Sequence, residues 1–401
     1  MHRFRSERLS AILLLSAAVV GLLLANLPGS EALLDVKDLH VGPAGIGLDL
    51  SMGHWISDGL LAVFFFIVAV ELKRELVIGE LNSPSKALLP AIAAVGGVIV
   101  PALIFVGFTA GTDAIDGWPI PTATDIAFAL GVLAVFGRFI PTRLRVFLLA
   151  LAVLDDLVAI LIIAFFFTTD ANLASLALAG IAVALFGAVT KLMKPRSAYI
   201  LARRPQWPIV LLLVVLAVLA WYFTYRSGVH ATIAGVALGL VASRRPGGRA
   251  AHALEPWSNA VVLPLFALSA AMVAVPQVAP ADLDPAFWGI LVGLPVGKLV
   301  GIVLAGWLGG LLAARRTRTP LTFGDLATIG ALGGIGFTVS LLMNELAFAG
   351  DADRSAAGTI AVLLGSGISI VCSAFAVSAR SRHYRRAGVH AGDGGGGTFG
   401  H

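Results

Sequence analysis

The sequence has little charge and almost no cysteine, and each shortage limits the class of protein that it encodes. Only 13% of its 401 residues are Asp, Glu, Lys or Arg, whereas 58% are hydrophobic. A soluble protein of this length carries about twice that share of charged residues. The single cysteine, Cys372, excludes an intrachain disulfide, and the apolar run around it favours a small buried side chain. We therefore expect an all-α polytopic membrane protein without disulfides.

Two classes of partner also lack support in the sequence. No G-x-x-x-x-G-K-[ST] stretch is present, so ATP is not an expected partner and an ion gradient is the expected energy source. The net charge of +5 comes from short basic clusters between hydrophobic runs. Such clusters orient membrane helices and do not indicate a nucleic-acid partner. No cofactor is expected.

About twelve hydrophobic runs are long enough to cross a bilayer. The predicted spans are residues 10–27, 57–80, 87–110, 114–137, 144–168, 173–194, 208–223, 226–242, 256–275, 286–312, 325–349 and 356–380. The first run resembles a signal peptide in its basic start, but it is long for one and no clear A-x-A site follows it. We interpret it as the first transmembrane helix.

The charges between the runs predict the orientation of the chain. Basic residues precede the first span and follow every second span: Arg3, Arg5 and Arg8; Lys73, Arg74 and Lys86; Arg138, Arg143 and Arg145; Lys191, Lys194, Arg196, Arg203 and Arg204; Arg244, Arg245 and Arg249; Arg315, Arg316 and Arg318; Arg380, Arg382, Arg385 and Arg386. The opposite loops contain Glu31, Asp35, Asp38, Asp113, Asp116, Asp170, Asp282, Asp284, Asp351 and Asp353. Because cytoplasmic loops carry the excess of Lys and Arg, both termini are predicted to be cytoplasmic.

Two segments outside the spans have a distinct composition. The first outer loop, Ser30–Ser57, is the long one, and the weak apolar alternation of Leu39–Ser51 is compatible with a short β-hairpin. The C-terminal residues 381–401 end in AGVHAGDGGGGTFGH, a glycine-rich sequence that we expect to be disordered.

The centre of the predicted fifth span, within Arg143–Phe167, contains two adjacent carboxylates, Asp155 and Asp156. Each aspartate near the bilayer midplane costs about 2.5–3.5 kcal/mol on insertion scales. Arg145 precedes Asp155 by about 15 Å of helix, which is half the thickness of a ~30 Å hydrocarbon core. Carboxylates at this depth are functional residues by default, although a buried structural pair is the alternative.

Two other spans have sequences that interrupt a helix. Span four carries Pro119 and Pro121 before Thr124 and Asp125, where free backbone groups and threonine hydroxyls are able to coordinate a cation. Span eleven carries four glycines within Gly330–Ser340. Each interrupted span is the second of three, and the two triplets start on opposite sides of the membrane, which is typical of inverted-repeat transporters.

This pattern predicts five parts of the chain. Residues 87–168 and 286–380 are the first and second inverted repeats and form the core. Residues 1–86 supply the first helices and the outer loop as an interface region, residues 169–285 are linking helices, and residues 381–401 are the tail.

Lys298 in span ten also lies near mid-depth, beside the row Gly289, Gly293, Gly297 and Gly301, which permits close helix packing. We interpret Lys298 as a counter-charge to a central carboxylate, since a lysine so far from either interface is unlikely to reach water. Adjacent residues on a helix point about 100° apart. We therefore assign Asp156 to the ion, and Asp155 to an ion pair with Lys298 or to a second proton.

Five polar residues nearer the interfaces have two interpretations. His230, at the outer start of span eight, is either an interfacial residue or a pH sensor. Near the cytoplasmic face, Glu71 and Glu75 end span two, and His252 and Glu255 open span nine. These four residues either anchor helices at the interface or form a funnel that attracts cations.

Two other functions remain open at this point. A sodium-coupled solute symporter requires a larger cavity, and the midplane has no aromatic or arginine cluster to line one. An intramembrane aspartyl protease would use two aspartates on separate spans. The adjacent aspartates and the midplane lysine argue against the protease.

Taken together, several stretches resemble the NhaA-type sodium/proton antiporters over about residues 8–385. The matching stretches are VELKREL (Val70–Leu76), PTATDIAFALGV (Pro121–Val132), LDDL (Leu154–Leu157), SGVHATIAGV (Ser227–Val236), GK (Gly297–Lys298) and GIGFTVS (Gly334–Ser340). The resemblance implies electrogenic exchange of Na⁺ or Li⁺ for H⁺ by alternating access, in a bacterial inner membrane, by a homodimer formed through the first outer loop.

The resemblance also implies roles for individual residues. It matches Asp155 and Asp156 to the central carboxylate pair of the family, and Asp125 and Lys298 to the charges where the two broken helices cross. Asp156, Asp155 and Thr124 are the expected ligands of the transported Na⁺. Carboxylates kept from water favour their protonated form, so a proton and a small hard cation compete for the same oxygens.

Overall fold

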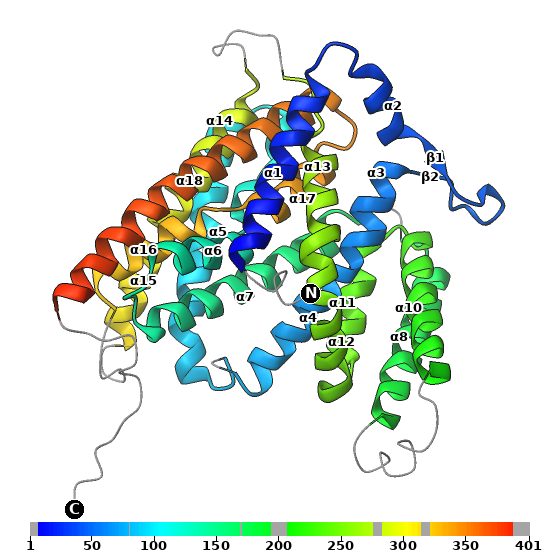
Figure 1. Ribbon diagram of the computed structural model, residues 1–401, viewed down its shortest axis with the longest axis horizontal. Helices are drawn as coiled ribbons and strands as arrows, with labels where there is room; N and C mark the ends of the chain where they lie inside the picture. Colours follow the sequence, from blue (N-terminus) through cyan, green and yellow to red (C-terminus); the bar gives the residue numbers. More distant parts are fainter. Residues whose placement is uncertain are drawn as a thin grey trace, which may run out of the picture. The chain divides into compact units, whose positions relative to one another are not determined.

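A computed structural model of the chain describes residues 7–79, 81–168, 171–193, 207–275, 283–313 and 321–387 (Figure 1). The glycine-rich end of the predicted tail, several basic loop residues such as Arg3, Arg196 and Arg315, and the acidic Asp170 and Asp282 lie outside these residues. The described chain divides into two compact units, and each is considered by itself. The roles predicted for the five parts of the chain stay predictions.

The first unit falls within Leu13–Gly79 and Ile160–Met272. Its elements are α1 (Glu7–Ala25, begun in the other unit), α2 (Glu31–Asp38), β1 (His40–Val41), η2 (Ala44–Ile46), β2 (Leu50–Ser51), α3 (Met52–His54), the π-helical η3 (Trp55–Leu60), α4 (Leu61–Val77), α8 (Leu173–Leu192), α10 (Trp207–Arg226), α11 (Thr232–Val241), α12 (Arg244–Trp257), the π-helical η6 (Ser258–Val262) and α13 (Leu263–Ala271). In it, α4 packs against α11, and α8 packs against α10 (Figure 1).

The second unit falls within Ser6–Ile12, Glu80–Ala159 and Val273–His401. Its elements are α5 (Pro84–Thr109), η4 (Asp113–Gly117), η5 (Ile120–Thr122), α6 (Ile126–Phe136), α7 (Thr142–Phe166, whose end belongs to the other unit), α14 (Pro285–Val292), the π-helical η8 (Gly293–Gly297), α15 (Lys298–Ala313), α16 (Phe323–Gly333), α17 (Phe337–Ala347) and α18 (Ala352–Arg386). The core of this unit includes α16 and α17, which are buried over most of their length.

Among the described residues, seven helices are long and apolar enough to cross a membrane: Met52–Val77, Ala87–Thr109, Thr142–Phe166, Leu173–Leu192, Trp207–Arg226, Pro285–Leu311 and Ala352–Arg386. Two helix pairs add a span each and are bent at a break, by 40° after Thr122 and by 51° after Gly333. The two predicted interruptions are therefore confirmed. Three further predicted spans coincide with α1, with α11 and with η6–α13, which are shorter apolar segments in the described chain, so the count of twelve stays a prediction.

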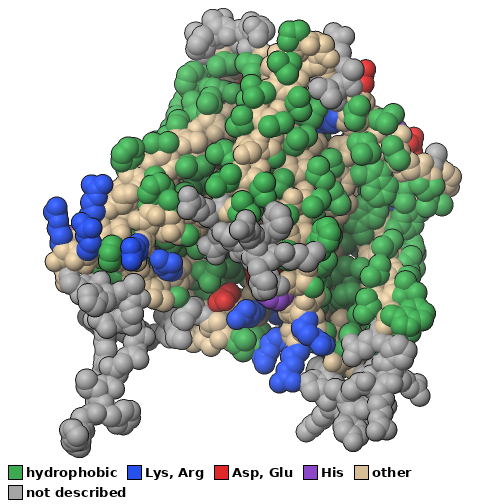
Figure 2. Space-filling view, viewed as in Figure 1, with side chains coloured by type: hydrophobic (Ala, Val, Ile, Leu, Met, Phe, Trp, Pro, Cys, Tyr) green, Lys and Arg blue, Asp and Glu red, His purple; other side chains and the backbone are tan. Residues whose placement is uncertain are grey.

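The surface is consistent with contact with lipid. Hydrophobic side chains cover most of the face in Figure 2, while Lys and Arg gather in a few clusters. One expectation about α18 is wrong: Cys372 is exposed and not buried. It lies beside the exposed Val371, close to the exposed Ile368 and Phe375, and all four residues suit an apolar solvent.

The first outer loop contains the expected hairpin. Strands β1 and β2 are antiparallel, with His40 opposite Ser51 and Val41 opposite Leu50. The loop is attached to its own unit by α10, where Tyr222 Oη donates a hydrogen bond of 3.0 Å to the Ile46 carbonyl. In Figure 1 the hairpin extends beyond α2 and α3.

The glycine row of span ten brings α14, η8 and α15 into close contact with α5. A Cβ on Gly301 would lie 2.2 Å from the Gly96 carbonyl oxygen, and one on Gly96 would lie 2.5 Å from the Gly301 carbonyl oxygen. Gly289 and Gly297 likewise face Phe105 and Pro101 of α5. The predicted close packing is confirmed, and it brings the start of α15, where Lys298 lies, against α5.

A cluster of charges, the Asp325 cluster, connects three helices of the second unit. Asp325 lies in the first turn of α16 in a capping box with Thr322, and its side chain is fully buried. Arg380 Nε and Tyr384 Oη of α18 each donate a 2.7 Å hydrogen bond to Asp325 Oδ1. Arg143 Nη2 of α7 lies 3.9 Å from Oδ2. Sequence reasoning treated the arginines as loop charges and missed the carboxylate between them.

We expect Gly301→Ala to destabilise the protein by about 1–3 kcal/mol, because the added methyl group overlaps the backbone of α5. Gly310 is the matched control in the same helix, since a Cβ there meets no atom within 4 Å. Gly310→Ala should be neutral or slightly stabilising. The measurement is the thermal unfolding midpoint of each purified variant in detergent, and equal midpoints for the two variants would contradict the packing described.

Asp325→Asn should destabilise the protein by about 2–3 kcal/mol, because Arg380 and Arg143 lose the carboxylate between them. Asp353, exposed in the first turn of α18, is the control: Asp353→Asn should cost under about 1 kcal/mol. Both losses of stability are measured by unfolding the variants in detergent, with tryptophan fluorescence as the signal. A loss at Asp325 no larger than that at Asp353 would show that the Asp325 cluster is not a stabilising contact.

Candidate ion-binding site

The centre of α7 contributes Asp155 to a buried ion pair. Lys298 Nζ, at the first position of α15, lies 2.5 Å from Asp155 Oδ2, and both side chains are fully buried. An ammonium group so far from water is tolerated only when it is paired. Lys298 therefore contacts a central carboxylate, and that carboxylate belongs to Asp155.

The break in span four brings a threonine hydroxyl into contact with the same oxygen, Asp155 Oδ2. Pro119 and Pro121 precede the break, and Ala123 to Asp125 are extended and not helical. Thr124 Oγ1 lies 2.7 Å from Asp155 Oδ2 and 2.8 Å from the carbonyl oxygen of Gly333, at the end of α16. Thr124 thus joins the two broken spans beside Asp155, because its hydroxyl contacts both the Asp155 carboxylate and the Gly333 carbonyl.

The second carboxylate oxygen of Asp155, Oδ1, has a different environment from Oδ2. Within the described part of the chain, Oδ1 is buried and has no hydrogen-bond partner. A buried carboxylate oxygen without a partner is costly, and it is an acceptor for a proton or a cation. The oxygens of Asp155, Thr124 and Gly333 are the hard ligands that a small cation prefers.

Asp125 lies where α6 and α17 both begin. Its Oδ1 accepts hydrogen bonds from the amides of Ala127 (3.1 Å) and Phe128 (3.2 Å) as the N-cap of α6. Its Oδ2 accepts from Thr338 of α17, from the amide at 3.2 Å and from the hydroxyl at 2.7 Å. One carboxylate thus offsets the partial positive charge at the start of two half-helices. Four donors occupy its acceptor sites, which favours charge compensation over direct contact with an ion.

The backbone of the two breaks is also joined directly. The amide of Asp125 donates a 2.5 Å hydrogen bond to the Ile335 carbonyl. Gly336 lies so close that an added Cβ would be 3.1 Å from the Ala123 carbonyl oxygen. The sequence predicted both interruptions but not Thr338, Ile335 or the Gly333 carbonyl as partners, because these contacts exist only once the two spans meet.

Asp156, the residue assigned to the ion, is buried on α7 next to Asp155, with 9% of its surface exposed against 1% for Asp155. Among the described residues, no group of three or more His, Cys, Asp or Glu side chains is arranged to bind a metal ion. A cation at this site would therefore be bound by a few carboxylate oxygens together with hydroxyl and carbonyl oxygens.

The proposed funnel residues lie in the first unit. Glu71 and Glu75, one turn apart on α4, interact electrostatically with each other, and Glu71 also interacts with Glu255 of α12. His252 Nδ1 lies 3.6 Å from Glu255 Oε2 on the same helix. The structure thus brings together carboxylates from α4 and α12, and their role as helix anchors or as a funnel stays a prediction.

His230 lies in the loop between α10 and α11 of the same unit, where it is buried. Its Nε2 is 3.3 Å from Asp58 Oδ1, and its Nδ1 is 2.9 Å from Thr232 Oγ1. The residue is therefore a paired histidine, and its role as an interfacial residue or a pH sensor stays a prediction.

Comparison with known proteins shows to which family the sequence of this chain is similar. Residues 1–377 match the family described as Na⁺/H⁺ antiporter 1. The chain is 60% identical over 390 residues to the Na⁺/H⁺ antiporter NhaA 2 of Clavibacter michiganensis, covering 97% of this chain and 94% of that protein. It is 45% identical to the Na⁺/H⁺ antiporter NhaA of Tropheryma whipplei, over 92% of this chain and 93% of the relative.

A third relative, the Na⁺/H⁺ antiporter NhaA 3 of Streptomyces coelicolor, is 44% identical over 95% of this chain and 80% of its own length. These matches span both broken helices, the paired aspartates of α7 and Lys298. The chain is thus a helical polytopic membrane protein that belongs to the Na⁺/H⁺ antiporter 1 family.

Proposed function

We propose that this chain exchanges Na⁺ or Li⁺ for H⁺ across a bacterial inner membrane, and that both ions compete for the oxygens of Asp155 and Asp156. The observation that carries the proposal is the unpartnered, buried Asp155 Oδ1 beside the Lys298 ion pair, at the point where two broken spans meet. Family membership supports the exchange itself. The substrates are the ions, and the reaction requires no cofactor.

Competition follows from the charges of the site. Among the described residues, Asp125, Asp155 and Asp156 are buried together with one buried ammonium group, Lys298. Ionised carboxylates in excess of cations are unfavourable away from water, so the site is stabilised when it binds a proton or a metal cation. A cation that binds the carboxylates displaces the proton, and a proton displaces the cation.

The breaks in the two spans supply the remaining ligands. Thr124 Oγ1 and the Gly333 carbonyl lie beside Asp155, so a dehydrated Na⁺ that reaches Asp156 would find oxygens on more than one element. Asp125 keeps the starts of α6 and α17 electrically compensated while the ions exchange. Alternating access would expose this fixed site to each side in turn.

The arrangement in the membrane extends the proposal. We infer that both termini are cytoplasmic and that residues 87–168 and 286–380 are inverted repeats. The alternation of basic and acidic loops supports the cytoplasmic termini. The breaks in the second span of each triplet support the inverted repeats. We further infer a homodimer formed through the first outer loop, since the β1–β2 hairpin leaves Leu39, Val41 and Ile46 exposed.

Asp156→Asn should abolish the Na⁺-dependent collapse of a pH gradient, because an amide neither binds a proton in this range nor carries the charge that attracts Na⁺. The assay follows a pH-sensitive dye in inverted membrane vesicles after Na⁺ is added. Asp353→Asn, an exposed aspartate outside the site, should exchange like the unchanged protein. Full exchange by Asp156→Asn would refute the assignment of Asp156.

Lys298→Ala should move the pH profile of exchange in the alkaline direction. Without the ammonium group, the buried Asp155 carboxylate loses its counter-charge, so the proton-free site becomes less favourable. Lys298→Arg keeps the positive charge and should remain closer to the original profile. The profile is measured in the same vesicles between pH values of about 6 and 9, which is the range around neutral pH. An unchanged profile for Lys298→Ala would refute the counter-charge role.

A further inference from the structure

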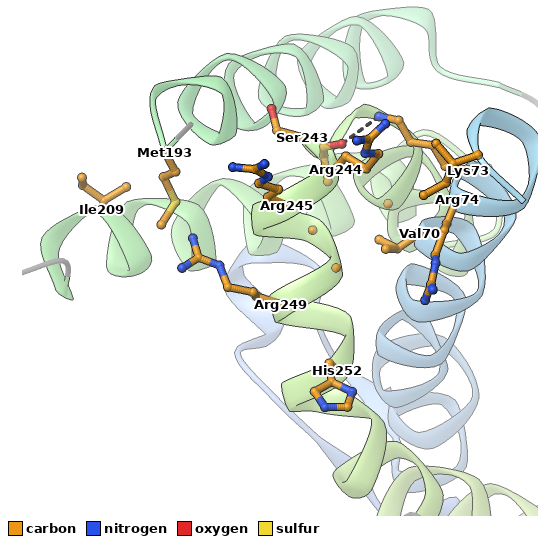
Figure 3. A pocket seen from close by; sticks show the side chains of 15 residues that line it. Val70, Lys73, Arg74, Met193, Ile209, Ser243, Arg244, Arg245, Arg249 and His252 are labelled. Atoms are coloured by element: carbon orange, nitrogen blue, oxygen red, sulfur yellow. Dashed lines mark hydrogen bonds between the residues drawn. The ribbon is translucent and has the colours of Figure 1, made fainter. Parts of the chain in front are cut away.

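The arginines of the two units differ in what they surround. In the first unit, Arg244, Arg245 and Arg249 line a cavity of about 690 Å³ (Figure 3). In the second unit, Arg143 and Arg380 lie around the buried carboxylate of the Asp325 cluster. The second set therefore connects helices within one unit, and two of these helices supply oxygens to the candidate ion-binding site.

The hydroxyl group of Tyr384 connects α7 to α16 by hydrogen bonds. It donates a bond of 2.7 Å to Asp325 Oδ1 of α16 and accepts one of 3.2 Å from Arg143 Nη2 of α7. It also accepts a bond of 3.3 Å from Arg380 Nη2 of its own helix, α18. Arg143 itself approaches Asp325 only to 3.9 Å, which is beyond hydrogen-bond distance. The buried hydroxyl therefore has partners on three helices.

The neighbouring Ser381 contacts a third element. Its Oγ accepts a hydrogen bond of 3.3 Å from the amide of Phe139, in the connection between α6 and α7. The other end of α6 follows the break that contains Thr124. We call Arg380, Ser381 and Tyr384 the α18 anchor. The α18 anchor thus contacts all three of α6, α7 and α16 at positions distant from the ion site.

Two of these helices carry the effect of the anchor to the ion site. Asp155 follows Arg143 by about 18 Å of α7, and Gly333 follows Asp325 by about 12 Å of α16. All residues of α16 from Asp325 to Gly333 except Ala327 are buried. Because a close-packed helix transmits displacement along its length, movement of α16 against α7 at the anchor also moves the Gly333 carbonyl.

The contact at the ion site is sensitive to such movement. Thr124 Oγ1 lies 2.7 Å from Asp155 Oδ2 and 2.8 Å from the Gly333 carbonyl oxygen. A hydroxyl group has one proton, so it donates to one of these two acceptors at a time. A hard cation requires several oxygens at once, whereas a proton binds one carboxylate oxygen. Displacement of Gly333 therefore removes a ligand from Na⁺ and not from H⁺.

We propose that Tyr384 is a positioning residue for the exchange: its hydroxyl group fixes α16 against α7 and so sets the preference of the ion site for Na⁺ over H⁺. Loss of the hydroxyl group leaves the carboxylates of α7 in the chain and moves the Gly333 carbonyl relative to Thr124. Na⁺ then binds less tightly, while the bound ion is still transported. This inference rests on the proposed function, because it concerns the Na⁺ that the site is proposed to exchange.

The experiment measures exchange in inverted membrane vesicles with a pH-sensitive dye while Na⁺ is titrated. Tyr384→Phe removes the hydroxyl group and retains the ring, whose centroid lies 4.7 Å from Cζ of Arg380. The matched control is Tyr222→Phe in the first unit, which also loses one hydroxyl hydrogen bond, of 3.0 Å. Thermal unfolding in detergent shows whether each variant is folded. Ser381→Ala tests the same anchor if Tyr384→Phe does not fold.

The half-saturating Na⁺ concentration should rise about fivefold in Tyr384→Phe, which corresponds to the loss of one hydrogen bond, and the maximal rate should be retained. Ser381→Ala should shift the concentration in the same direction, and Tyr222→Phe should change neither quantity. A lower maximal rate with an unchanged half-saturating concentration would show a merely structural role and overturn the proposal. So would a Tyr384→Phe variant that matches the unchanged protein.

The same measurement separates this inference from the proposed function. Exchange by the unchanged protein without a shift in Tyr384→Phe would refute the role of the α18 anchor alone. Absence of Na⁺-dependent exchange in the unchanged protein would refute the proposed function, and the positioning role with it.

Discussion

The buried contact between Lys298 and Asp155 is the interaction on which the second unit depends. A fully buried ammonium group is stable only beside a carboxylate, and a fully buried carboxylate needs further donors. The chain supplies one donor from Thr124 and leaves Asp155 Oδ1 without a partner in the described residues. The arrangement is therefore stable but incomplete, and on the proposed function a proton or a small cation completes it.

Other features of this unit make that contact geometrically feasible. The glycine row allows α15 to approach α5 closely, which brings Lys298 into the interior. Asp125 caps α6 and also binds the first turn of α17, so two half-helices begin at one carboxylate. At the other end of α16, the Asp325 cluster fixes the half-helix whose last residue, Gly333, reaches Thr124. The ion site thus rests on contacts made some distance from it.

Much of this arrangement was predictable from the sequence, because charge within an apolar run is conspicuous. The interruptions at Pro119–Asp125 and within Gly330–Ser340 and the outer hairpin followed from local patterns. The Asp155–Lys298 contact was one of the two roles that the sequence left open for Asp155. The partners of Asp125 did not, because Thr338 and Ile335 come close only when two distant spans meet. The Asp325 cluster and the His230–Asp58 contact were missed for the same reason, and Cys372 was expected to be buried but is exposed.

Competition between H⁺ and Na⁺ for the same buried oxygens is tested most directly by calorimetric titration of the purified protein with Na⁺ at several pH values. One displaced proton predicts that the apparent Kd for Na⁺ rises about tenfold for each unit by which the pH is lowered, with release of a proton into the buffer on binding. A Kd for Na⁺ that does not change with pH, with no proton released, would contradict competition at the Asp155–Asp156 site.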